Sequence, residues 1–173
     1  AKLISKHFVV FLFFFISGVC FYLILKKIID NDDFCYLALL LYLLYPYLFG
    51  QSLFSPKDVP FMAIWVVCTY LSFNVFENLI QNENVTSKSL IILSISTAFL
   101  ISIRVTGILI LLQYLISLTI YSISSGTSFK IFLKTIYSKI LIFILFLIIF
   151  IYLFYPLYWL DPKLFITAIR EMG

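Results

Sequence analysis

The sequence predicts an all-α protein: a polytopic bundle of about six transmembrane helices, followed by an amphipathic helix at the membrane interface. Composition is the first observation behind this prediction. Hydrophobic residues make up 64% of the 173 residues and charged residues only 12%, whereas soluble domains are about half apolar and about a quarter charged. Apolar runs long enough to cross a bilayer, roughly 17–25 residues, also recur along the chain. We therefore expect residues 1–173 to form a single integral-membrane domain in contact with membrane lipids.

Five apolar stretches predict the spans, namely residues 8–25, 34–50, 60–77, 89–123 and 139–155. The fourth stretch would reach about 52 Å as one helix, although the hydrocarbon core of a bilayer is only about 30 Å thick. It is therefore predicted to form two short spans that turn near Arg104-Val105-Thr106-Gly107. With a loop at 124–138 before the last span, the chain would cross the membrane six times.

The end of the chain predicts a helix that lies in the interface. Asp161 followed by Pro162 is a helix start signal, because Asp caps the first N–H groups and Pro fits the first turn. An apolar face follows at helical spacing, formed by Leu164, Phe165, Ala168, Ile169 and Met172. Because the chain begins with Ala1 and stops at Gly173, just after this segment, we expect a fragment of a longer protein.

Basic residues do not decide the orientation by number. Alternating loops place six of them on one side, Lys26, Lys27, Lys88, Lys130, Lys134 and Lys139, and six on the other, Lys2, Lys6, Lys57, Arg104, Lys163 and Arg170. The first set flanks spans as cytoplasmic anchors do. Lys57 and Arg104 instead stand in mostly apolar settings, where a charge is costly and usually functional. We therefore expect the first set in the cytoplasm and the second set outside.

Composition also disfavours several functions. The net charge is +4 with no run of five basic residues, so a nucleic-acid partner is not expected. His7 is the only histidine, and the three cysteines fall in or beside apolar runs, which makes a zinc site improbable. The acidic cluster at 30–33 lacks the spacing of a calcium loop and is expected to be a solvated turn.

Two sets of charged residues are candidates for chemistry. Lys57 and Asp58 lie between Pro56 and Pro60 in a predicted tight turn, where a lysine can hold a phosphate and a carboxylate can bind a cation or accept a proton. Charges at the edge of the membrane would explain the same residues without function. Arg104 interrupts an apolar stretch, so it is either an interfacial anchor or a phosphate-binding residue that faces a wet cavity.

Three segments in order resemble the GT-C glycosyltransferases, in particular the protein O-mannosyltransferase and aminoarabinose-transferase group (glycosyltransferase family 39). The first is LLLYLLYPYLFGQSLFSPKDVPFMAIWVVCTYL at 39–71, which is similar to a P…F..S.F.PKD.PF region of bacterial members. The second is ISIRVTGILILL at 101–112, and the third is YPLYWLDPKLFITAIREM at 155–172. Together they cover little more than a third of the chain.

The resemblance implies a multi-pass enzyme of the bacterial inner membrane. It would transfer a sugar from a polyprenyl-phosphate-linked donor to a glycan, lipid or protein acceptor on the extracytoplasmic face. The main catalytic carboxylate is then expected upstream of Ala1, so the fragment alone should be inactive. By the same resemblance Asp58 is the supporting carboxylate and the candidate ligand of Mg²⁺ or Mn²⁺. Lys57, Arg104, Tyr45 and Gln51 are the expected substrate-binding residues.

Two other functions remain open. Intramembrane charge also marks transport pathways, so a transporter or flippase of a lipid-linked substrate is the alternative. Internal repeats, which transporters often carry, are not found in the sequence. A scaffold subunit without catalysis is the third interpretation, in which Lys57 and Asp58 could be replaced without consequence.

Overall fold

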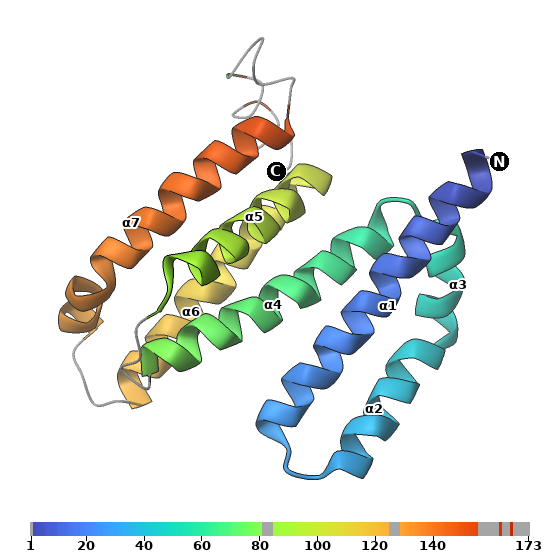
Figure 1. Ribbon diagram of the computed structural model, residues 1–173, viewed down its shortest axis with the longest axis horizontal. Coiled ribbons are helices and arrows are strands. Elements are labelled where there is room, and N and C mark those ends of the chain that lie inside the picture. Colours follow the sequence, from blue (N-terminus) through green and yellow to red (C-terminus); the bar gives the residue numbers. More distant parts are fainter. Residues whose placement is uncertain (1, 81–84, 125–128, 156–162, 164–166, 168–173) are drawn as a thin grey trace. The chain divides into compact units, whose positions relative to one another are not determined.

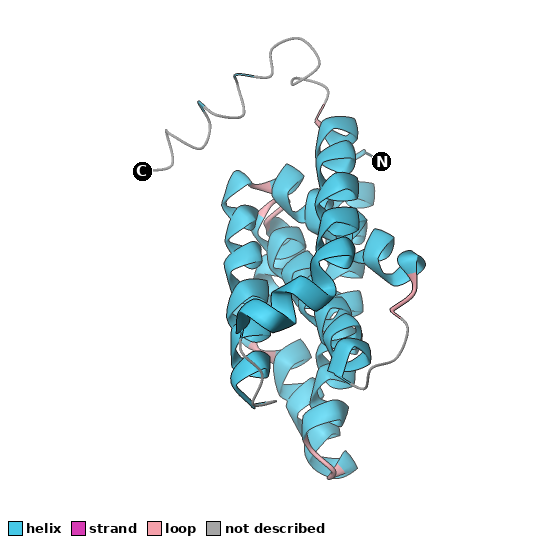
Figure 2. Cartoon of the chain, turned by 90° about the vertical axis from the view of Figure 1, so that its left-hand side faces the viewer, coloured by secondary structure: helices cyan, strands magenta, loops and turns pink. Residues whose placement is uncertain are grey.

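The computed structural model describes residues 2–80, 85–124, 129–155, 163 and 167. Throughout these residues the chain is helical with short connections, and no strand occurs among them (Figures 1 and 2). The chain divides into two compact units, Ala1–Tyr70 and Leu71–Gly173, and each unit is described by itself. The all-helical prediction is confirmed, and the expectation of a single domain stays a prediction.

The helices follow the apolar runs of the sequence. They are α1 (Lys2–Ile28), α2 (Asp32–Leu44), α3 (Pro46–Phe54), α4 (Asp58–Ile80), α5 (Ser87–Ile103), the 3-10 helix η1 (Val105–Ile108), α6 (Leu109–Ser124) and α7 (Phe129–Phe154). The first unit holds α1 to α3 and the start of α4, and the second holds the end of α4 and the remaining helices.

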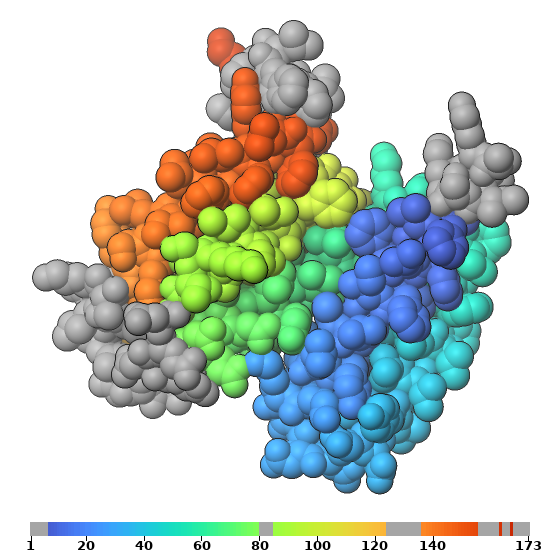
Figure 3. All heavy atoms as spheres, in the orientation of Figure 1, coloured from blue at the N-terminus to red at the C-terminus, as the bar shows by residue number. Residues whose placement is uncertain are grey.

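In the first unit, α2 and α3 together run antiparallel along the whole of α1. Ring contacts mark the path from the C-terminal to the N-terminal end of α1: Tyr22 with Tyr36, Phe14 with Tyr42, Phe11 with Phe49, and His7 with Phe54. The space-filling view shows the blue side chains of α1 directly against the cyan side chains of α2 (Figure 3). The broken helix pair therefore extends along α1 from one end to the other, as a single interrupted span would.

The break between α2 and α3 lies at Tyr45 and Pro46, where the two helices bend by 49°. Tyr45 has φ −57° and ψ 115°, which is outside the helical region. Proline has no N–H for the helical hydrogen bond and restricts the preceding residue to extended conformations. The span predicted at 34–50 is therefore not one continuous helix, although the bent pair can count as one broken span.

A buried hydroxyl pair joins α1 to α2. The hydroxyl of Ser17 donates its one hydrogen to the carbonyl of Phe14 at 2.6 Å. The hydroxyl of Tyr42, whose oxygen lies 2.8 Å from Ser17 Oγ, therefore donates to Ser17. The ring of Tyr42 also stacks between Phe14 and Phe21, with centroid distances of 5.6 and 4.9 Å. Polar and aromatic contacts at this one residue thus hold the two helices in register.

In the second unit, α5 is the central helix and α7 packs parallel to it. Ser94 Oγ lies 3.1 Å from the carbonyl of Phe143, and the ring of Phe99 meets that of Phe154 at 5.8 Å. Small buried residues of α5, among them Ser94 and Ala98, let the helices approach closely. Leu147 of α7 completes the buried cluster around Ala98.

The predicted turn near Arg104 is confirmed. Arg104 is extended, with φ −146° and ψ 133°, and it separates α5 from η1. Beyond Arg104 the chain reverses its direction. The evidence is that the hydroxyl oxygens of Thr97 and Tyr114 lie 3.1 Å apart. In one continuous helix these two residues would lie about 25 Å apart. The limit set by bilayer thickness thus predicted the break correctly.

The prediction of six spans is not confirmed. Among the described residues, four helices are long and apolar enough to cross a membrane: His7–Ile28, Asp58–Leu79, Val105–Ile123 and Ile136–Phe154. Counting the bent pair α2 and α3 as one span gives five. Helix α5, with 17 residues, is apolar but shorter than the others. These helices are compatible with an integral membrane protein.

One other boundary differs from the prediction, and the predicted C-terminal helix is not tested. The loop placed at 124–138 is too long, because α7 already begins at Phe129 and no glycine or proline interrupts the sequence from there to Phe154. Polar residues such as Ser138 and Lys139 end the apolar run without ending the helix. The predicted interfacial helix after Asp161 falls on a segment that lies, apart from residues 163 and 167, outside the described residues.

Candidate functional site

The turn that carries Lys57 and Asp58 is held by Ser55. The N–H of Ser55 donates to the carbonyl of Gln51 at 2.8 Å and so ends α3. Its hydroxyl oxygen accepts the N–H of Asp58 at 3.2 Å and so caps the start of α4. The same hydroxyl donates to Oδ2 of Asp58 at 2.9 Å. Ser55 therefore fixes both the backbone and the carboxylate of Asp58, in the manner of a capping box.

Helix α4 starts earlier than the sequence suggested. The predicted span begins at residue 60, yet α4 begins at Asp58, and the carbonyl of Lys57 accepts the N–H of Phe61 at 3.1 Å. Pro60 thus lies in the first turn, where N–H groups have no partner within the helix. Proline is tolerated there, so the helix begins two residues before the predicted span.

Lys57 and Asp58 are both exposed. Their backbones are adjacent on a turn that hydrogen bonds hold at both ends. An exposed ammonium beside an exposed carboxylate can hold a phosphate and bind a cation or accept a proton. The part that Asp58 plays in the cap explains an acidic residue here equally well, so a functional test must separate the two roles.

Gln51 and Tyr45 relate differently to this turn. Gln51 is half-buried on α3, one helical turn before Ser55, which its carbonyl contacts. Tyr45 lies at the other end of α3, at the break from α2, and is 55% exposed. The nine residues of α3 measure about 14 Å. The structure therefore brings Gln51 near Lys57 and Asp58 and leaves Tyr45 a helix length away.

Arg104 belongs to the second unit and is exposed at the break between α5 and η1. Its carbonyl accepts the N–H of Gly107 at 2.8 Å, and its N–H lies 3.3 Å from the carbonyl of Leu100. Both backbone groups are therefore occupied by the turn. Because the other candidate residues lie in the first unit, a shared site with Arg104 stays a prediction.

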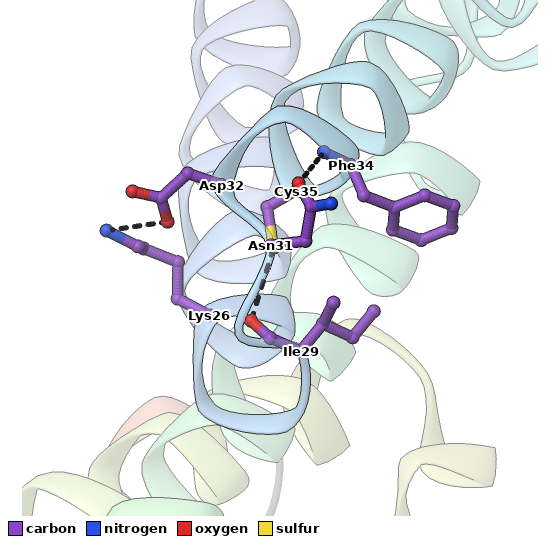
Figure 4. Close-up of polar contacts among 6 residues, drawn as sticks. All are labelled: Lys26, Ile29, Asn31, Asp32, Phe34 and Cys35. Carbon is purple, nitrogen blue, oxygen red and sulfur yellow. Dashed lines mark hydrogen bonds and ion pairs between the residues drawn. The ribbon is translucent and has the colours of Figure 1, made fainter.

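The acidic cluster at the turn from α1 to α2 has a structural role (Figure 4). Asn31 Oδ1 accepts the N–H of Phe34 at 3.1 Å and caps α2. Asp32 Oδ1 lies 3.2 Å from Nζ of Lys26, and Asp33 is in the first turn of α2, where negative charge complements the helix dipole. All these side chains are exposed, as expected for a solvated turn.

Within the described ranges, no group of three or more His, Cys, Asp or Glu side chains is placed to hold a metal ion. A single carboxylate with its Ser55 partner offers few of the oxygen ligands that Mg²⁺ or Mn²⁺ needs. Metal binding at Asp58 stays a prediction that would need ligands from elsewhere.

An apolar cavity in the second unit was missed by the sequence reasoning. It measures about 370 Å³ and is walled by the end of α4 and by α5, α6 and α7. Each of the four helices contributes side chains to the lining, for example Phe76 from α4, Leu93 from α5, Tyr114 from α6 and Phe143 from α7. Lys139 is the charged residue of the lining. No local sequence signal marks such a cavity, because its lining comes from residues between 75 and 147.

Comparison with known protein families, curated proteins and solved structures finds no match for this chain. Over the residues that it describes, the structure defines an all-helical protein with four to five candidate membrane-spanning helices. The resemblance to glycosyltransferases therefore stays a prediction.

Replacing Ser55 with alanine is expected to destabilise the protein by about 1 kcal/mol, because the first N–H of α4 loses its cap. The melting temperature of the detergent-solubilised protein should fall by about 2–4 °C. Ser55→Thr, which keeps the hydroxyl, is the control and should melt close to the parent protein. Equal melting of the alanine variant would show that the cap seen at 3.2 Å does not stabilise the helix.

Proposed function

We infer that this chain is part of a membrane glycosyltransferase that takes its sugar from a polyprenyl-phosphate donor. The observation that supports this most is the turn from α3 to α4, where an ammonium and a carboxylate stay exposed on a backbone pinned by Ser55. The described part of the chain also contains several apolar helices that could embed a lipid-linked donor.

The proposed reaction breaks the bond between the anomeric carbon of the sugar and the phosphate oxygen. An acceptor hydroxyl oxygen forms the new bond to that carbon, and its proton passes to a carboxylate acting as general base. The phosphate leaves with the bonding electron pair and gains negative charge. Cations held near it stabilise the transition state more than the ground state.

Each predicted residue has a part in this scheme. Lys57 and Arg104 bind the donor phosphate, and Asp58 supports the principal carboxylate or, with Mg²⁺ or Mn²⁺, helps to hold the ion. Gln51, whose carbonyl accepts the N–H of Ser55 in the same turn, would contact the same substrate as Lys57. Tyr45 would line the approach from the other end of α3.

Asp58→Asn tests this function separately from folding. Asparagine keeps a side-chain oxygen for the hydroxyl of Ser55 and leaves the backbone cap intact, but it removes the negative charge. We expect transfer from a panel of polyprenyl-phosphate sugars, measured in membranes that contain the whole protein, to fall about tenfold or more. The melting temperature should stay unchanged.

Ser55→Ala is the matched control, because it removes the cap and keeps the carboxylate. Ser55→Ala should lower the melting temperature, which Asp58→Asn should not. At a permissive temperature it should reduce transfer less than Asp58→Asn does. If Asp58→Asn transfers sugar at the parent rate, the role of Asp58 is structural and the proposed site fails. If the parent protein transfers no sugar from any donor of the panel, the glycosyltransferase proposal itself is overturned.

A transporter or flippase is the second candidate, and the broken helix pair α2 and α3 favours it. Interrupted helices often form the binding sites of transporters. In proteoliposomes a flippase would move a fluorescent polyprenyl-phosphate lipid between leaflets without forming a glycosylated product. Product formation without translocation would exclude this candidate.

A further inference from the structure

We propose that the cavity of the second unit binds one acyl chain of an anionic phospholipid, whose phosphate lies against Lys139. The walls are hydrocarbon almost throughout, with Leu90 and Leu93 from α5 facing the same space as Ile140 from α7. Its volume of about 370 Å³ falls within the roughly 300–1,000 Å³ of pockets that bind small molecules.

An empty cavity of this kind is unfavourable, because its lining atoms lack packing partners on one side. Water is a poor filler, since a buried water needs about two to four polar partners and the walls offer few. The helices that form the walls include three candidate membrane spans, so lipid chains are the hydrocarbon available to fill it.

The two ends of the cavity differ in character. Lys139 lies in the first turn of the candidate span Ile136–Phe154, and Leu79 is the last residue of the span Asp58–Leu79. This end is therefore at the level where a span meets the polar headgroups. Leu147, about 12 Å further along α7, lines the cavity and belongs to the buried cluster around Ala98. The cavity thus leads from a cationic rim into an apolar interior, which matches an amphiphile.

The positive charge of Lys139 favours an anionic lipid as the occupant of the cavity. Lysine packs its alkyl stem on apolar surface and keeps its ammonium at the polar boundary, where it attracts anionic headgroups. An apolar helix from a second copy of the chain would fill the walls but leave Lys139 without a counter-charge. Lys139 is also on the side predicted to be cytoplasmic, where anionic lipids are concentrated. The acyl chain of an anionic phospholipid packs against the apolar walls, and its phosphate pairs with the ammonium of Lys139.

Within the second unit, the lipid site is separate from Arg104, the residue of that unit that is proposed to bind the sugar donor. Arg104 follows the C-terminal end of α5, next to the region where Phe99 meets Phe154 at the end of α7. Lys139 lies near the opposite end of α7, so about 22 Å of helix separates it from Phe154. The lipid proposal therefore stands whether or not the protein transfers sugar.

Native mass spectrometry of the detergent-purified protein, incubated with equal amounts of phosphatidylglycerol and phosphatidylcholine, tests the proposal. We expect one phosphatidylglycerol bound per chain, preferred over phosphatidylcholine by about fivefold. Phosphatidylglycerol should also raise the melting temperature of the unmodified protein, because a ligand that binds only the folded state stabilises it.

Two variants test the two parts of the site. Lys139→Ala should abolish the preference for phosphatidylglycerol, whereas Lys88→Ala, which removes an exposed cation of α5 outside the cavity, should retain it. Leu115→Trp should lower the binding of both lipids, because Leu115 lines the cavity yet is half exposed and a larger ring can fill the opening. Melting curves verify that each variant is folded.

Several results would overturn the proposal. One is equal retention of the two lipids by the unmodified protein, and another is an unchanged preference in folded Lys139→Ala. Unchanged lipid binding by folded Leu115→Trp would show that the chain does not enter the cavity. A lipid-free dimer under the same conditions would assign the cavity to a second copy instead.

Discussion

Replacing Arg104 with alanine is expected to lower sugar transfer by the whole protein about 100-fold, if the arginine binds the donor phosphate as proposed. A fixed cation matters most when the phosphate departs, because negative charge on its oxygens grows in the transition state. The backbone of Arg104 already serves the turn between α5 and η1, and alanine can make the same backbone hydrogen bonds. The loss should therefore appear as reduced transfer at an unchanged melting temperature.

Arg104→Lys and Lys88→Ala are the matched controls. Lysine keeps the charge but loses the planar fork that binds two phosphate oxygens at once, so its activity should be intermediate. Lys88 is an exposed cation in the first turn of α5, the helix that Arg104 terminates, and its loss should leave transfer unchanged. Full activity of Arg104→Ala would leave the arginine as an interfacial anchor.

Replacing Gly107 with alanine is expected to destabilise the second unit by about 1–3 kcal/mol, as for other insertions into a tightly packed site. A Cβ atom on Gly107 would lie 3.0 Å from the carbonyl carbon and oxygen of Leu100 and 3.1 Å from the nitrogen of Ile101. These are backbone atoms of the last turns of α5, which cannot rotate away. The turn itself would have to open, and the melting temperature should fall by several degrees.

Gly18→Ala is the matched control in the first unit. Its Cβ would meet Cδ2 of Leu43 at 2.7 Å, which is a closer contact than any at Gly107. That atom is the end of a flexible side chain, and alanine in mid-helix also gains about 1 kcal/mol of helix propensity. We expect Gly18→Ala to melt near the parent protein. The reverse order of stability would show that η1 does not lie closely against α5.

Local patterns predicted the features of the chain that depend on local physics. Hydropathy predicted the helices, and the thickness of a bilayer predicted the break at Arg104. The bend at Pro46 was equally readable, since a proline lacks the N–H of a helical bond. It was missed because the run 34–50 was judged by hydropathy alone, which takes no account of that missing donor.

The hydrogen bonds of Ser55 are a feature that the sequence patterns did not predict. The Lys57-Asp58 pair stood out as charge in an apolar setting, whereas no role was predicted for Ser55. In the structure Ser55 bonds both the N–H and the carboxylate of Asp58, which depends on the conformation of the turn between α3 and α4. The capping-box spacing of Ser55 and Asp58 was present in the sequence and was the signal that could have found it.

By itself, the sequence determined that the protein is an array of apolar helices with breaks at a few polar or proline residues, because those properties belong to single segments. Only the tertiary structure decided which helix faces meet. It alone joins Thr97 to Tyr114 and forms a partly open cavity between side chains from α4 to α7, with Lys139 at one end. The physical reason is that apolar side chains pack against one another without preference for partner. Their pairing therefore depends on turn geometry and on the few hydroxyl contacts between helices.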